Sequence, residues 1–386
     1  MLAPRLLPIA TLLALVACED PAASRPPGPD TTTLPPAVAP GPGSWVIPRR
    51  DVMPLYRDGR PTAAFEMRAR DVGVVLRHGD GPDSSDAFGA RDVWAYEADG
   101  TYYLHYDAAG PRGWLVALAT SPDLEHWTKR GLVLDLGAAD QPDSRTASYG
   151  VTYRDRNAWH LFYLGATQTM LGPGLVPMGP YVTLKARADS PAGPWRKQRD
   201  VIPFWPTPGT FYAHTASPGP IVRHDGEYLQ LFSAAEVRGD RIFRTIGLAR
   251  TTHLDSAWRV SDAPLLPPEE QVENAALYHQ ESDGTWFMFV NHVGMNEHGI
   301  EYTDAIWVYW THDPLRWEPE RRAVVMDART STWAKRIVGL PSVLRVGDRL
   351  ALLYDGRAGT VLPSGTGQHM DRDVGLAWLE LPLVAR

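Results

Sequence analysis

The chain has 386 residues, which is long for one core of the ordinary type, since domains usually hold about 100 to 200 residues. Its formal net charge of -7 argues against a nucleic-acid partner, because such a partner favours a basic face. One cysteine excludes an internal disulfide, and cysteine and histidine show no zinc-type spacing. We therefore expect stability to come from packing, without a metal or another cofactor.

The first 17 residues are typical of a bacterial secretory signal. Arg5 precedes an apolar stretch, residues 6–17, that is too short to span a membrane in the mature protein. The stretch ends in LVAC, which resembles a lipobox, where the cysteine becomes the lipidated N-terminus. We predict lipidation of Cys18 and an extracytoplasmic location on a bacterial membrane, held only by this lipid. The alternative is an ordinary signal peptide with an incidental cysteine.

A proline-rich segment follows at residues 18–43. Residues 19–43 hold eight prolines among 25 positions. Such a segment cannot bury enough apolar surface to fold and is expected to act as an extended tether. The folded body then spans residues 44–386, and we expect it to be monomeric.

The segment 90–134 predicts one four-stranded antiparallel meander. Its runs are rich in Val, Tyr and Trp, and turns such as Asp99-Gly100 separate them. Short runs of this kind, joined by Asp-Gly, are typical of β-hairpins. The four runs cover residues 93–96, 102–106, 114–119 and 132–134.

The same pattern recurs along the chain. Its second run returns as WHLFY, EYLQLF, TWFMFV and RLALLY. A tryptophan after each later turn recurs at separations of 68, 63 and 59 residues, at Trp127, Trp195, Trp258 and Trp317. Five such sheets predict an all-β fold, a five-bladed β-propeller with four-stranded antiparallel blades around a central channel.

The repeats divide the body into five blades. A further candidate strand at residues 72–76 precedes them, and we expect it to cover or close the last blade. The blades are predicted at residues 90–134, 146–203, 215–266, 273–325 and 339–384.

Two carboxylates are expected at the mouth of the channel. In such a blade, the start of the first strand and the end of the second lie on one face. Among the residues that precede each first strand, Asp92 and Glu273 are acidic. Hydrolysis of an acetal needs one carboxylic acid and one carboxylate, so this pair favours a glycosidase. The alternative is structural, with Asp92 paired to Arg91 and Glu273 capping a turn.

The blade pattern, here DGTYYLHY and SPDLEHW, resembles the five-bladed β-propeller glycoside hydrolases of the arabinanase, β-xylosidase and α-L-arabinofuranosidase group. The resemblance covers residues 89–386. It implies that Asp92 is a general base and that Glu273 is the general acid, although Glu273 stands in the fourth blade where the group has its acid in the third. Blade three offers His214 instead.

The group also has a second aspartate, which tunes pKa and orientation, and no aspartate stands at the start of blade two. We expect Asp304 to take this third catalytic role, with Asp355 as the next candidate. Relatives sometimes hold a calcium ion in the channel, but nothing like a calcium loop occurs in this sequence.

Several other polar groups are expected on the same face. If Arg91, Arg336 and Arg372 converged unpaired, they would suit a carboxylated or sulfated sugar, because guanidinium binds such groups bidentately. The predicted substrate-binding residues are Arg91, His214, His292, Arg336, His369, Arg372 and Trp333.

We therefore predict a glycoside hydrolase that acts on a poly- or oligosaccharide, with inversion by a single displacement. The alternatives are a non-catalytic glycan-binding surface lipoprotein, which would need no carboxylates, and a propeller enzyme that performs phosphorolysis.

Overall fold

The computed structural model describes residues 41–50, 54–172 and 174–385. Regular structure in these ranges is almost entirely β-strand, as the sequence pattern predicts. No helix among the described residues is long and apolar enough to cross a membrane. The predicted signal peptide, Cys18 and most of the tether lie outside the described residues. The helical elements in these ranges are the short 3₁₀ helices η1 (Pro82–Ser84), η2 (Pro268–Glu270) and η3 (Gly365–His369).

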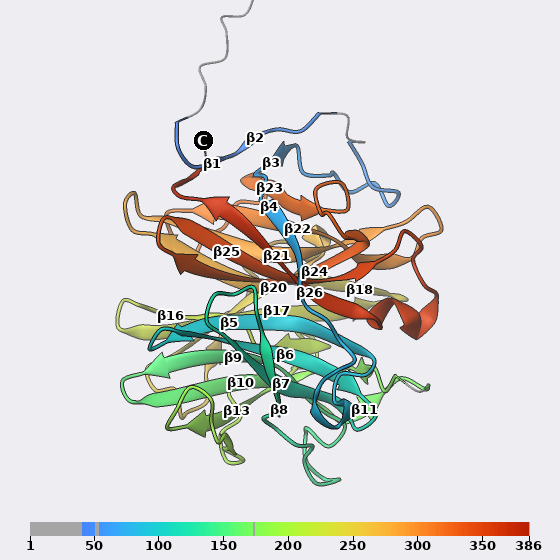
Figure 1. The fold of residues 1–386 in the computed structure, drawn as a ribbon, viewed down its shortest axis with the longest axis vertical. Helices are drawn as coiled ribbons and strands as arrows, with labels where there is room; N and C mark the ends of the chain where they lie inside the picture. The colour runs from blue at the N-terminus through green and yellow to red at the C-terminus, as the bar shows by residue number, and fades with distance from the viewer. Residues whose placement is uncertain (1–40, 51–53, 173, 386) are drawn as a thin grey trace, which may run out of the picture. The chain divides into compact units, whose positions relative to one another are not determined.

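The first two repeats share one 8-stranded sheet (Figure 1). The first meander holds β5 (Gly89–Ala98), β6 (Thr101–Gly110), β7 (Gly113–Ser121) and β8 (Thr128–Leu132). The second holds β9 (Thr146–Asp155), β10 (Ala158–Ala166), β13 (Val182–Ala188) and β14 (Arg196–Lys197), with β11 (Gln168–Thr169) and β12 (Pro177–Met178) as a separate pair. The meanders join where β7 runs parallel to β9.

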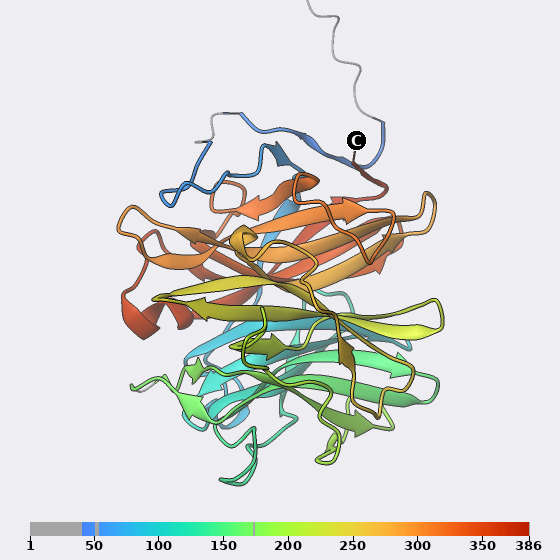
Figure 2. The same cartoon turned by 180° about the vertical axis from the view of Figure 1, so that it is seen from behind.

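The third repeat forms a sheet of its own. Its first strand is interrupted where Pro218 and Pro220 lack the N–H groups that a continuous ladder needs. In Figure 2 its yellow-green strands lie between the green strands of the second repeat and the orange strands of the fourth. It holds β15 (Thr215–Ser217), β16 (Ile221–His224), β17 (Glu227–Arg238), β18 (Arg241–Thr251) and β19 (Arg259–Val260).

The fourth and fifth repeats form two more antiparallel sheets. The fourth holds β20 (Val272–Gln280), β21 (Thr285–Met295), β22 (Glu301–Thr311) and β23 (Arg322–Asp327). The fifth holds β24 (Ala334–Val346), β25 (Arg349–Ala358) and β26 (Arg372–Glu380).

Segments from the start of the body complete these sheets. The strand β4 (Arg70–Leu76) pairs antiparallel with β26, so the prediction of a strand at residues 72–76 that adds to the last repeat is confirmed. In Figure 1 the blue β4 lies among orange and red strands. The shorter additions are β1 (Ser44–Trp45) beside β27 (Leu383–Val384), and β2 (Ile47–Pro48) and β3 (Phe65–Glu66) beside β23.

Apolar side chains pack between neighbouring repeats. Each interface has its own buried cluster, because strands that are apolar on both faces must be covered on both. The last repeat also packs against the first, through Leu353 and Leu104. The other clusters contain Leu115 with Leu161, Phe162 with Phe232, Leu231 with Met288, and Phe289 with Leu352.

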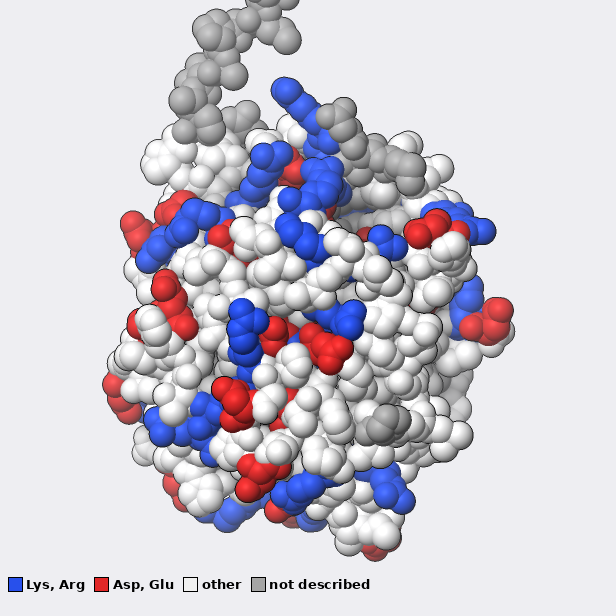
Figure 3. All heavy atoms as spheres, turned by 45° about the vertical axis from the view of Figure 1, so that its right-hand side comes forward, with Lys and Arg blue, Asp and Glu red and all other residues white. Residues whose placement is uncertain are grey.

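Most charged side chains of the described residues lie at the surface. In the middle of the face drawn in Figure 3, Lys and Arg side chains lie next to Asp and Glu side chains. Many charged side chains of the described residues form ion pairs, such as Arg196 with Asp189 at 2.9 Å.

Candidate active site

The first strands of several repeats begin at a cavity of about 700 Å³, which we call the main cavity. Asp92 and Glu273 both line it, although they come from the first and the fourth repeat. Three of the predicted substrate-binding residues line it as well, namely Arg91, His214 and His369. The structure therefore brings together the two carboxylates that the repeat alignment selected.

Asp92 stands on a β-bulge near the start of β5. The ladder between β5 and β6 shifts register between Arg91 and Trp94, and Asp92 has a φ of 50°. This left-handed conformation is unfavourable for a residue with a side chain, and such strain is common at functional sites. The Asp92 N–H donates to Oδ2 of Asp355 at 3.2 Å, and Nε of Arg91 lies 3.1 Å from Oδ1 of Asp92. The expected Arg91 ion pair therefore exists, and it lies inside the cavity.

Asp107, at the end of β6, was not selected from the sequence. It pairs with Arg91 across the ladder and lines the main cavity, but only 1% of its surface is exposed. Burial and the neighbouring Asp92 carboxylate raise the pKa of Asp107 well above its usual value of 3.8. The raised pKa favours the protonated form of Asp107, which lies beside Asp92.

Side chains at the end of a second strand hold the bulge of the following repeat. In each case the side-chain oxygen accepts a hydrogen bond from the backbone N–H of the bulged residue. The pairs are Asp107 with Tyr149, Ser233 with Asn274 at 2.7 Å, and Asp355 with Asp92 at 3.2 Å.

Among the described residues, the second repeat has no such hydrogen bond to the repeat that follows it, and the reason is physical. Leu164 occupies the position of Asp107, and the residue opposite it in the next repeat is Pro218, which has no N–H to satisfy. Asp107 and Asp355 therefore stand where a backbone N–H of the next repeat needs an acceptor. A sequence signal for them exists, because Asp107 and Asp355 both directly follow the tyrosine that ends the aromatic run of the second strand.

Glu273 lies opposite Asn291 in the ladder of β20 and β21. Nδ2 of Asn291 donates to Oε1 of Glu273 at 3.2 Å, and Nε of Arg244 lies 3.6 Å from Oε2. The bulged residue next to it, with a φ of 56°, is Asn274, so Asn274 and not Glu273 occupies the position of Asp92. Glu273 is the more exposed carboxylate of the pair and is open to the cavity.

Tyr149 occupies the same bulge position in the second repeat, with a φ of 40°. Its hydroxyl is buried in the wall of the main cavity and has no hydrogen-bond partner. Burial, and then the nearby carboxyl groups of Asp92, Asp107 and Glu273, raise the pKa of Tyr149, so the phenol stays protonated. The wall of the main cavity therefore holds one O–H donor without a protein acceptor.

The histidines of the main cavity are neutral near neutral pH. Burial, and then Arg91 and Arg372, lower the pKa of His369 to about 2. Burial and then Arg244 lower the pKa of His214. Both rings can therefore accept a hydrogen bond as well as donate one.

The three arginines expected to converge do not. Arg91 lies over the Trp114 ring at 4.8 Å and beside Asp92. Arg372 is buried behind the cavity, and its Nη1 lies 3.2 Å from both oxygens of Asp355. Arg336 lines another cavity. The condition for an anion site formed by these three residues is therefore not met.

Asp304, His292 and Arg336 do not line the main cavity. Asp304 and Arg336 line a second cavity of about 540 Å³, and His292 is buried beside it. Oδ1 of Asp304 lies 2.6 Å from Nδ1 of His292, and the Tyr56 hydroxyl donates to Oδ2 at 3.0 Å. Trp333 lines neither cavity and packs on Tyr354 at 5.8 Å. The structure therefore separates these residues from Asp92 and Glu273.

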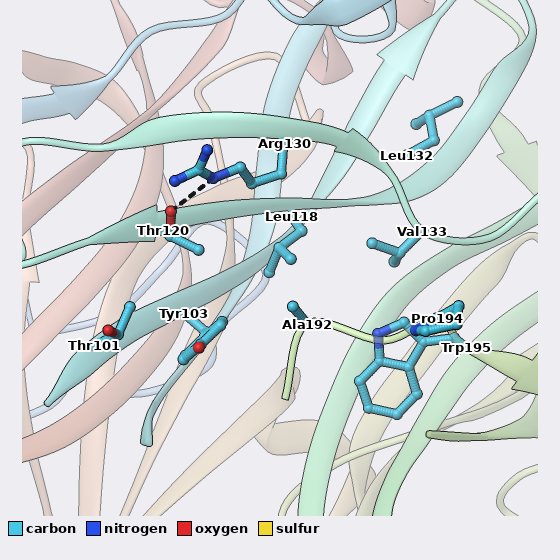
Figure 4. Close-up of a pocket in the computed structure, with 10 residues that line it drawn as sticks. All are labelled: Thr101, Tyr103, Leu118, Thr120, Arg130, Leu132, Val133, Ala192, Pro194 and Trp195. Atoms are coloured by element: carbon cyan, nitrogen blue, oxygen red, sulfur yellow. Dashed lines mark hydrogen bonds between the residues drawn. The ribbon is translucent and has the colours of Figure 1, made fainter. Parts of the chain in front are cut away.

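A further cavity, drawn in Figure 4, lies between the first two repeats. It includes Thr101, at the start of β6, and Thr120, near the end of β7, so it lies at the opposite strand ends from Asp107. No Asp or Glu lines it, and its arginine, Arg130, donates to the Thr120 hydroxyl at 2.9 Å. In the ranges that the structure describes, no group of three or more His, Cys, Asp or Glu is placed to hold a metal ion.

Comparison with known proteins gives a fold but no sequence family. No protein-family model matches the sequence, and a search of the curated proteins finds no significant match.

Solved structures of β-propeller glycoside hydrolases are similar over most of the chain. One is the catalytic domain of a family 62 α-L-arabinofuranosidase from Coprinopsis cinerea, with 11% identity, 81% of this chain and 96% of that chain covered, and a TM-score of 0.57. An endo-arabinase from Bacteroides thetaiotaomicron has 14% identity, covers 81% and 98%, and has a TM-score of 0.54. A family 117 glycoside hydrolase from Zobellia galactanivorans has 15% identity, covers 81% and 91%, and has a TM-score of 0.54. This chain therefore has the all-β fold of these hydrolases.

Proposed function

We propose that this protein is a glycoside hydrolase that cleaves a glycosidic bond in the main cavity. The observation that carries the proposal is that Asp92 and Glu273, from distant repeats, line one cavity together with a third, buried carboxyl group, Asp107, whose pKa is raised. Acetal hydrolysis needs an acid and a base on opposite sides of the scissile bond. A binding protein would have no need to bury one carboxyl group beside another.

We further propose that the body is a closed, five-bladed propeller. Each repeat supplies one four-stranded sheet, with β4 as the outer strand of the last. The cluster between the fifth and the first repeat, which includes Leu353 and Leu104, supports closure of the ring. Closure also accounts for the bond from Asp92 of the first repeat to Asp355 of the last.

In the proposed mechanism, Asp92 is the general base and Glu273 the general acid. A water molecule gives a proton to Asp92 while its oxygen forms a bond to the anomeric carbon. The bond from that carbon to the leaving oxygen breaks, and this oxygen takes the proton of Glu273. A single displacement of this kind inverts the anomeric configuration.

Asp107 and Tyr149 support this reaction. Asp107 shares its proton with Asp92 and so holds the base in one orientation, which makes Asp107 a positioning residue in the role expected for Asp304. The free O–H of Tyr149 is available to a sugar oxygen between the two carboxylates. The similar structures named as arabinofuranosidases and an arabinase make arabinose-containing glycans the first substrates to test.

Secretion and anchoring remain part of the proposal. The lipobox-like sequence at Cys18 and the proline-rich tether support a monomeric enzyme that is attached to the outside of a bacterial membrane through its lipid only. Labelling with radioactive palmitate, lost in Cys18→Ala, tests this part.

The activity is tested by two variants that keep the size of each side chain. In Asp92→Asn and Glu273→Gln, kcat on the best arabino- or xylo-oligosaccharide is expected to fall by about 100- to 10,000-fold. Substrate affinity and the melting temperature should stay close to those of the wild type. If both variants keep full turnover, the main cavity is not the active site, and if the wild type binds glycans without turnover, the protein is a lectin.

A further inference from the structure

The second cavity has no role in the proposed reaction, yet residues from three parts of the chain line it. Arg49 and Tyr56 approach it from the N-terminal segment, Asn296 and Trp307 from the β21–β22 hairpin, and Arg336 from β24. Its volume of about 540 Å³ is in the usual range for a small-molecule site.

Three buried N–H groups around this cavity have no acceptor. They are Nε of Arg49, Nε1 of Trp307 and Nε of Arg336, and all three residues line the cavity. A buried donor without a partner destabilises the fold, so native structures rarely keep one without a ligand or water to satisfy it. The three donors therefore favour an occupant that is rich in oxygen acceptors.

The carboxylates around the cavity are already engaged. Asp304 accepts from Tyr56 and faces His292. Asp327 accepts from Nη2 of Arg49 at 2.8 Å.

Three arginines and three carboxylates line the cavity, and one of these arginines has no ion pair among the described residues. Glu297 faces Nη2 of Arg336 at 3.4 Å, so this arginine keeps its Nε free. Arg57 also lines the cavity, is exposed and has no ion pair among the described residues. The cavity thus offers donors and an unpaired positive charge, which an anion would satisfy.

The second cavity adjoins the main one. Met295 lines both cavities. In the turn that follows, Asn296 and Glu297 face the second cavity, whereas Ile300 and Glu301 face the main cavity. A glycan chain that leaves the main cavity across this turn would therefore reach the second cavity directly.

The main cavity itself offers no comparable cation. Arg91 faces Asp92 at 3.1 Å, and Nη1 of Arg244 donates to Glu301 at 2.8 Å. Arg241 likewise donates to Asp58 of the N-terminal segment at 3.1 Å. An acidic group on the substrate is therefore better accommodated in the second cavity.

We propose that the second cavity binds an anionic sugar unit, carrying a carboxylate or a sulfate, of the same glycan that is cleaved in the main cavity. This inference rests on the proposed function and names its substrate class as an acidic glycan whose scissile unit is neutral. Guanidinium groups suit such a unit because Nε and an outer N–H bind two oxygens of one anion at once.

Binding is tested by calorimetry in the Asp92→Asn background, in which turnover is suppressed. The probes are trigalacturonate, a sulfated carrageenan tetrasaccharide and a neutral arabinotriose. We expect one acidic probe to bind at least about tenfold more tightly than the neutral probe, and Arg336→Gln to remove about tenfold or more of that affinity. Which acidic probe binds tells a carboxylate from a sulfate.

Two more variants make the result decisive. Arg57→Gln removes an exposed and unpaired cation, so it should fold normally and should also weaken acidic binding. Arg316→Gln removes a charge that is 88% exposed and lines neither cavity, and it should change nothing. If both acidic probes bind no better than arabinotriose, or if Arg57→Gln and Arg336→Gln keep wild-type affinity, the proposal is overturned.

The outcome is separate from that of the proposed function. Hydrolysis of neutral oligosaccharides without binding of acidic probes overturns only the inference about the second cavity. Binding of an acidic probe that depends on Arg336, in a wild-type protein without any hydrolysis, supports this site and overturns the hydrolase.

Discussion

The main cavity and the second cavity hold similar side chains and differ in how their carboxylates are neutralised. In the main cavity, Asp107 is buried beside the Asp92 carboxyl group, and both effects raise its pKa. In the second cavity, Asp304 is satisfied by His292 and by the Tyr56 hydroxyl. A carboxylate that its neighbours already satisfy is a structural group, whereas one with a neighbouring carboxylate retains a proton that chemistry can use. Whether an acidic residue is structural or chemical therefore depends more on the groups that its carboxyl contacts than on its place at a strand end.

Apart from the changes at Asp92 and Glu273, the largest expected effect comes from Asp107. Asp107→Ala removes both the proton shared with Asp92 and the acceptor for the Tyr149 N–H, so kcat/KM should fall by about 100-fold. Asp107→Asn can still donate to Asp92 and accept from Tyr149, and it should stay within about tenfold of the wild type. Steady-state kinetics over a range of pH check this. Equal losses in the two variants would mean that the side chain acts only by filling space.

The same change in the second cavity should affect stability first. Asp304→Asn weakens the contacts to His292 and Tyr56, and we expect a loss of about 2 kcal/mol in the free energy of unfolding. Its loss of kcat should be far smaller than that of Asp107→Ala. Urea denaturation measures the free energy of unfolding, and steady-state kinetics on the same preparation measure kcat. A 100-fold loss of kcat would mean that Asp304 is a catalytic residue after all.

The raised pKa of Asp107 also predicts how the free energy of unfolding depends on pH. Its pKa is raised in the folded state, so above pH 3.8 the unfolded chain releases a proton that the folded protein retains. This contribution lowers the stability of the wild type as pH rises, by up to about 1.4 kcal/mol per pH unit. Asp107→Asn removes it, so the variant should gain stability relative to the wild type between pH 4 and pH 7. A difference that stays constant with pH would show that Asp107 is ionised.

The fold followed from the sequence because each repeat carries its own turn and strand signals. The aromatic second strands located the sheets, and residues 72–76 were correctly assigned to the last one. The residues of the predicted fourth strand at 132–134 instead mark the end of β8, which begins at Thr128. This strand lies at the outer edge of its sheet, where hydrophobic alternation is weakest.

The site was only partly predictable, because the alternation of apolar and polar residues in the sequence does not show where a strand has a bulge. A bulge between His292 and Val293 leaves Asp304 as the unpaired extra residue of β22, and its carboxyl group lines the second cavity. The bulge in β9 likewise gives Tyr149 the position of Asp92. Without the bulges, a regular strand register would have predicted that both side chains point to the other face of the sheet.

The smallest expected effect tests whether the free hydroxyl of Tyr149 is kept for the substrate. Tyr149→Phe removes only that oxygen, and because the oxygen has no partner in the protein, the free energy of unfolding should stay the same or rise. The kcat/KM should fall about three- to tenfold, which is the worth of one neutral hydrogen bond.

Tyr181 provides the matched control for that change in the same cavity. Its hydroxyl already donates to the Pro177 carbonyl at 2.8 Å, so Tyr181→Phe should lower stability by about 1 kcal/mol. Opposite signs in the stability of the two Tyr→Phe variants would show that a hydroxyl without a protein partner is held at a cost in folding and used in binding. If Tyr149→Phe lost stability and kept its activity, the hydroxyl would be satisfied by a buried water, and Tyr149 would then resemble Asp304 in having a polar group that is committed to structure.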